Sequence, residues 1–72
     1  MDLLETVADQ LARKALELPG TADDNTLINQ MAEAMGASSS TLQEAFLTAV
    51  RIRRAEARAE RALEAYRRRQ NL

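Results

Sequence analysis

The chain has 72 residues and a formal net charge of −1, and it contains neither cysteine nor histidine, which excludes disulfides, thiolate or imidazole metal sites, and Ser/His or Cys/His catalysis. Hydrophobic residues make up 46% of the sequence, but 14 of them are alanines, which leaves little large apolar surface for a core. We therefore expect a small all-α protein that depends on helix packing and self-association, is not an enzyme, and takes neither a cofactor nor a small-molecule substrate.

The sequence predicts three helices, of which the first two are short. The first covers residues 2–18, because its apolar residues recur near the helical period until Pro19-Gly20 ends it. The second covers residues 26–35, with Asn25 or Thr26 as its N-terminal cap. Gly36 follows as its C-terminal stop, where we expect a positive φ.

The third predicted helix is much longer, starting near Thr41 and meeting no helix breaker before Arg69. Both Ser40-x-x-Gln43 and Thr41-x-x-Glu44 fit a capping box at its start. One continuous helix over this stretch would be about 42 Å long, whereas a compact domain of this size has a radius of gyration of about 11 Å. Part of the helix should therefore project from the body, pack along the first helix, or meet a second chain.

The second half of this helix has an apolar stripe of small residues, whose alternating spacings of three and four are typical of a coiled-coil seam. The predicted seam consists of Ile52, Ala55, Ala59, Ala62, Leu63 and Tyr66. Alanines allow close approach of another helix but bury little area, so a partner is needed to stabilise this half. We expect a homodimer.

The small net charge conceals a strong asymmetry along the chain. Residues 1–50, the expected acidic three-helix body, carry two basic and eight acidic side chains, a net charge of −6. Residues 51–72, the basic Arg/Ala/Glu-rich extension of the last helix, carry eight arginines and three glutamates, a net charge of +5. Such an asymmetry predicts DNA or an acidic protein surface as the partner.

Nothing in the sequence predicts a membrane protein. No apolar run approaches the roughly 20 residues that span a bilayer. The N-terminal residues Asp2 and Glu5 are acidic where a signal peptide needs a positive region. We therefore expect a cytoplasmic protein that does not associate with membranes.

The segment of residues 28–46 ends one helix at Gly36, turns through serines and starts another, the arrangement of a helix-turn-helix. It resembles the helix-turn-helix of tetracycline-repressor-type regulators. The residues that match the family pattern are Ala32, Gly36, Ser38, Thr41, Leu42 and Phe46. The resemblance covers roughly residues 3–48 and implies DNA binding. Gln43 and Glu44 depart from it, since the family usually has tyrosine and basic residues there, and an Arg/Ala/Glu-rich helix stands where the family has a ligand-binding domain.

Eight residues are the candidates for contacting nucleic acid: Ser38, Ser39, Ser40, Gln43, Arg51, Arg54, Arg58 and Arg61. The serines, from the turn, and Gln43, from the start of the third predicted helix, would reach bases or phosphates. The arginines share one helix face, and this face would follow a phosphate backbone or an acidic protein surface. The alternative is a plain helical corner for the serines and a solvated face, alternating with glutamates, for the arginines.

Two functions remain open at this point. The first is a small DNA-binding transcriptional regulator, favoured narrowly because the helix-turn-helix and the arginine face are independent features that agree. The second is a protein–protein interaction module, such as an adaptor, a chaperone-like protein or a docking element, that uses its long C-terminal helix to dimerise or bind a partner.

Overall fold

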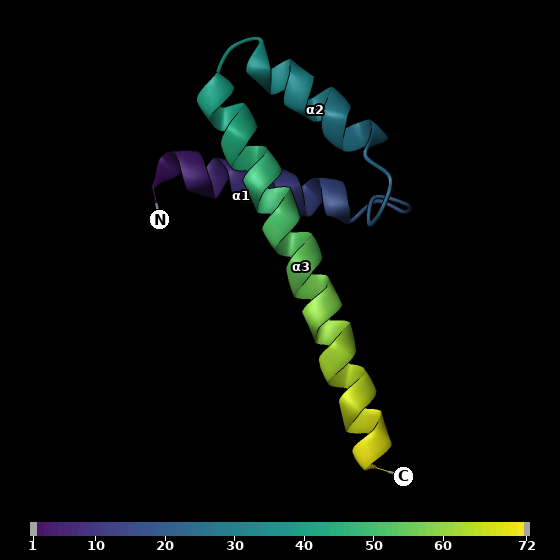
Figure 1. Ribbon diagram of the computed structural model, residues 1–72. Coiled ribbons are helices and arrows are strands. Elements are labelled where there is room, and N and C mark those ends of the chain that lie inside the picture. The colour runs from purple at the N-terminus through teal and green to yellow at the C-terminus, as the bar shows by residue number, and fades with distance from the viewer. Residues whose placement is uncertain (1, 72) are drawn as a thin grey trace.

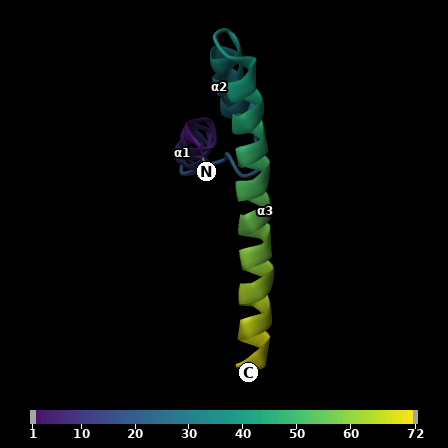
Figure 2. The ribbon, with the colours of Figure 1, turned by 90° about the vertical axis from the view of Figure 1, so that its left-hand side faces the viewer.

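The computed structural model describes residues 2–71, which form three α-helices and no strand. These are α1 (Leu3–Leu16), α2 (Thr26–Gly36) and α3 (Ser40–Gln70). Helix α1 crosses the first half of α3, α2 lies beside its N-terminal end, and the second half of α3 extends beyond both (Figure 1, Figure 2). The predicted all-α fold, a small three-helix domain with a long C-terminal helix, is confirmed.

Helix α1 begins and ends through local contacts. The carboxylate of Asp2 accepts a hydrogen bond of 2.9 Å from the backbone N–H of Glu5 and caps the first turn. The helix stops at Leu16, two residues earlier than predicted, where the N–H of Leu18 turns to the carbonyl of Ala15. Gly20 then reverses the chain with a φ of +83°. This left-handed conformation suits glycine because it has no Cβ.

Asn25 holds the N-cap position of α2, one of the two positions predicted for it. The capping bonds come from the residue before it, Asp24, whose Oδ1 accepts from the backbone N–H of Thr26 at 2.9 Å and from its hydroxyl at 2.7 Å. These two bonds stabilise the charged carboxylate and lower the pKa of Asp24. Asn25 makes no side-chain capping bond.

The expectation of a positive φ at Gly36 was wrong. Gly36 is the last residue of α2, and the only glycine with a positive φ is Gly20. What Gly36 provides is space: a Cβ built on it would lie 2.8 Å from the side-chain amide of Gln43. The missing side chain thus allows α3 to pack closely against the end of α2.

Helix α3 starts one residue earlier than predicted and is continuous. The hydroxyl of Ser39 accepts a hydrogen bond of 3.1 Å from the N–H of Leu42, so the cap is Ser39 and not Ser40 or Thr41. The helix then runs unbroken for 31 residues, or about 46 Å at 1.5 Å per residue.

The core of the body lies where the three helices meet. Alanines on one face of α1 allow that helix to approach α3 closely, and the side chain of Phe46 is fully buried between the elements. The buried hydrophobic residues are Ala8, Ala12, Ala15, Ile28, Ala32, Phe46 and Val50. No buried residue of α3 lies beyond Val50, so the core ends about one third of the way along this helix.

The second half of α3 projects into solvent. The radius of gyration is 14.7 Å and the longest dimension is 53 Å, compared with a radius of about 11 Å for a compact chain of this length. In residues 58–70, which we call the projecting segment, every residue except Ala65 is exposed. Within the single chain, the second half of the helix therefore leaves the body instead of packing along α1.

The two glycines are expected to respond differently to substitution by alanine. Gly20→Ala should destabilise the protein by about 1–2 kcal/mol, because a left-handed residue with a Cβ is strained. Gly36→Ala should change stability by less than about 1 kcal/mol, because the gain in helix propensity offsets the displacement of the flexible Gln43 side chain. Urea denaturation of both variants checks this contrast, and an equal or larger loss at Gly36 would contradict it.

Candidate functional site

The corner between α2 and α3 uses half of its predicted DNA-contacting side chains for its own structure. Ser39 caps α3, and Gln43 is half-buried over Gly36. Ser38 and Ser40 are exposed. No lysine or arginine occurs between residues 26 and 50, so the exposed face of this corner is neutral or acidic.

The four predicted arginines of α3 do not share one environment. Arg51, Arg58 and Arg61 are exposed, but Arg54 is half-buried against the loop that joins α1 to α2. Its Nη2 donates to the carbonyl of Thr21 at 2.7 Å, and its Nη1 donates to the Oδ1 of Asn25 at 2.8 Å. Arg54 therefore holds the loop against α3, a role that helical spacing alone does not reveal.

An ion pair that sequence reasoning missed joins α1 to α3. Arg53 binds Asp9 through two parallel hydrogen bonds, Nε to Oδ1 at 2.8 Å and Nη2 to Oδ2 at 2.7 Å, and its Nη1 contacts Glu56 at 3.1 Å. These hydrogen bonds lower the pKa of Asp9 and raise that of Arg53. The available indication was that Arg53 follows Phe46 and Val50 on the body-facing side of the helix.

Replacing Asp9 by asparagine is expected to lower the melting temperature at neutral pH. In the folded state the pKa of Asp9 is below its ordinary value of 3.8. The ionised carboxylate therefore stabilises the fold above pH 3.8, and this stabilisation is lost as the pH falls through the lowered pKa of the folded state. The difference in melting temperature between Asp9→Asn and the wild type should therefore shrink in acid. Thermal melts across this range check it, with Glu60→Gln, on the exposed side of α3, as the control. A difference that does not change with pH would contradict the assignment.

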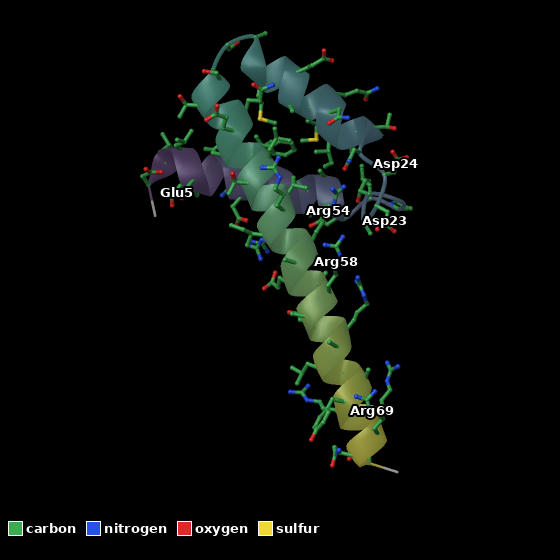
Figure 3. All side chains as sticks on the ribbon, in the orientation of Figure 1. Glu5, Asp23, Asp24, Arg54, Arg58 and Arg69 are labelled. Carbon is green, nitrogen blue, oxygen red and sulfur yellow. The ribbon has the colours of Figure 1, made fainter. Side chains whose placement is uncertain are left out.

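Arg58 and Arg61 border a cavity of about 280 Å³ between the end of α1, the following loop and α3. Figure 3 shows Arg54 and Arg58 on the side of α3 that faces the loop with Asp23. The lining residues are Arg13, Leu16, Glu17, Ala22, Asp23, Arg53, Arg54, Ala57, Arg58 and Arg61. Acids of the body thus lie across this cavity from the arginine face.

The predicted seam is exposed along its whole length. We call it the seam face, made of Ile52, Ala55, Ala59, Ala62, Leu63 and Tyr66. The exposed fractions are 62% for Ile52, 50% for Leu63 and 55% for Tyr66, which is high for such large apolar side chains. The guanidinium of Arg69 lies 5.9 Å from the centre of the Tyr66 ring. The structure therefore presents a continuous, uncovered apolar strip.

A groove opens where α1 crosses α3, at the body end of the seam face. It has a volume of about 630 Å³, in the range of ordinary binding clefts. Its lining residues are Leu4, Glu5 and Asp9 from α1 and Thr41, Glu44, Ala45, Thr48, Ala49, Ile52 and Arg53 from α3. Sequence reasoning missed this groove because it depends on the position of α1. Ile52 belongs both to the groove and to the seam face, which makes the two surfaces continuous.

The structure offers no centre for metal chemistry and no span for a bilayer within residues 2–71. In this range no group of three or more acidic side chains is placed to hold a metal ion. No helix in the same range is both long and apolar enough to cross a membrane. Comparison with known proteins finds no matching family model, no matching curated protein and no matching solved structure.

Proposed function

We propose that this protein is a non-enzymatic protein–protein interaction module that binds another polypeptide through the seam face of α3. The observation that supports this most strongly is the exposure of Ile52, Leu63 and Tyr66 on one side of a helix that leaves the body. Contiguous apolar surface of this kind, bordered by charged residues, is typical of interaction sites.

The energetics of the projecting segment favour a partner. The segment contributes no side chain to the buried core, whereas most helical stability in proteins comes from the packing of an apolar face. The alanines and arginines favour helix formation, and Glu64 lies 3.6 Å from Arg67, but an exposed pair of this kind contributes less than about 1 kcal/mol. Burial of the exposed half of Leu63 against a partner contributes about 0.8–1.5 kcal/mol. Most of the order of this segment should therefore come from association.

Amide hydrogen exchange on the dilute, monomeric chain tests this function. Residues 58–70 should exchange far faster than the residues around Phe46, because only the latter lie in the core. Equal protection of the two regions in a proven monomer would show that the projecting segment needs no partner, and the proposal would lose its basis.

A DNA-binding regulator is the second candidate, and the arginine face is what favours it. Arg51, Arg58 and Arg61 are exposed on one side of α3, and the helix-turn-helix order is present. It ranks second because Ser39, Gln43 and Arg54 make internal contacts, and because the body that would approach the phosphates carries a net charge of −6.

Fluorescence anisotropy with random duplex DNA tests this second candidate. Binding at about 50 mM salt that weakens by several orders of magnitude at about 200 mM salt is expected if many phosphates are contacted. Arg51→Gln combined with Arg58→Gln should then reduce the salt dependence. No binding at the lower salt concentration would exclude the regulator.

A further inference from the structure

We infer that the polypeptide bound by the seam face is a second copy of this chain, arranged antiparallel, so that the projecting segment of each chain lies in the groove of the other. This inference rests on the proposed function and names its partner. Two features of the structure support it, the continuity of the groove with the seam face and the distribution of charge, and the contact that they imply is reciprocal.

The groove and the projecting segment present matching apolar surfaces. Ala45 and Ile52 line the groove, and Ala59 and Tyr66 continue the same helix face at intervals of seven residues. An antiparallel partner therefore meets one continuous strip and places its own Leu63 and Tyr66 beside Ala45, Ala49 and Leu4. The alanines of both helices allow the close approach that the two larger side chains need.

Charge selects the antiparallel orientation. Glu5 and Glu44 stand on the walls of the groove, and neither takes part in an ion pair in the described residues 2–71. Arg67 and Arg69 follow Tyr66 in the sequence, at the other end of the helix. Antiparallel pairing brings these arginines to the partner's glutamates, whereas parallel pairing places two segments of like charge together at each end.

The proposed contact is reciprocal, and two copies of the chain complete it. In a twofold dimer each chain gives its projecting segment and receives its partner's, so both grooves and both seam faces are covered at once. The helical distance from Ala45 to Tyr66 is about 32 Å, long enough for the overlap to include both grooves. A second copy carries both an acidic-walled groove and a basic projecting segment, so it supplies the complementary charge at both ends of the contact.

Paramagnetic relaxation enhancement tests the arrangement directly. The chain has no cysteine, so Gln70→Cys provides a single attachment point for a nitroxide at the end of α3. When this variant is mixed with isotope-labelled wild type, any broadening in the wild type comes from the other chain. We expect broadening at residues 4–9 and 41–45. Broadening confined to residues 58–70 would show parallel pairing and overturn the inference.

Charge exchange provides a second, independent test. Glu5→Arg with Glu44→Arg, and separately Arg67→Glu with Arg69→Glu, should each weaken self-association by at least about tenfold, because like charges then meet at both ends. An equimolar mixture of the two variants should recover association, since each segment again meets a groove of opposite charge. Failure to recover would contradict antiparallel pairing. A wild type that stays monomeric would overturn the second copy, while the proposed function would then require a different polypeptide.

Discussion

Phe46→Ala is expected to leave the protein largely unfolded at moderate temperature. Phe46 has no exposed surface, and it is the largest buried side chain in a core otherwise made of four alanines, Ile28 and Val50. Truncation of a buried phenylalanine costs about 3–5 kcal/mol. A domain of this size has a total stability of about 4–11 kcal/mol, so the loss removes a large part of it.

Circular dichroism during thermal and urea denaturation, at a single protein concentration, measures this loss. Leu3→Ala is the matched control, because Leu3 is also a large hydrophobic residue but is 78% exposed, and its truncation should change stability by less than about 0.5 kcal/mol. If Phe46→Ala were as stable as Leu3→Ala, the core would not lie where the three helices meet.

Leu63→Ser combined with Tyr66→Ser is expected to raise the dissociation constant of the proposed dimer at least about 100-fold while the body stays folded. Both side chains are half-exposed or more in the single chain, so the substitutions cost the body little. Burial of the exposed half of each side chain contributes roughly 0.8–1.5 kcal/mol, and each occurs twice in a twofold dimer. Each 1.4 kcal/mol corresponds to a factor of ten in affinity.

Analytical ultracentrifugation of the double variant measures this change. Ala57→Ser combined with Ala65→Ser is the matched control, since it also introduces two serines into the same part of α3 but lies on a different face from the seam. The control should associate as the wild type does. If the control dissociated to the same extent, a loss of helix propensity would account for the effect, and the seam face would not be the interface.

Much of the fold was predictable because its determinants are local. Pro19 and Gly20 keep the chain from continuing the first helix beyond the turn at residues 17–20, the serine-rich turn separates the second from the third, and no breaker interrupts residues 41–69. The cap positions were less predictable, because several neighbouring serines, threonines and acids compete for the same backbone N–H groups. At α2 the side chain of Asp24 makes the capping bonds although Asn25 holds the N-cap position. At α3 Ser39 caps the helix in place of the expected Ser40 or Thr41.

The candidate site was predictable where it depends on one helix and not where it depends on two. The seam face follows from spacing along α3, and its exposure fits the scarcity of large apolar residues. The groove, the pairing of Arg53 with Asp9 and the anchoring of the loop by Arg54 need the crossing of α1 over α3. A helical period identifies which residues share a face, but it does not identify what lies opposite that face.

If a second copy of the chain covers the seam face in solution, the protein forms dimers as its concentration rises. Molar mass from light scattering over a series of protein concentrations tests this most directly. The mass should rise from the 8.0 kDa of the single chain toward twice that value as the concentration increases. A mass that stays at 8.0 kDa at every concentration would contradict dimer formation.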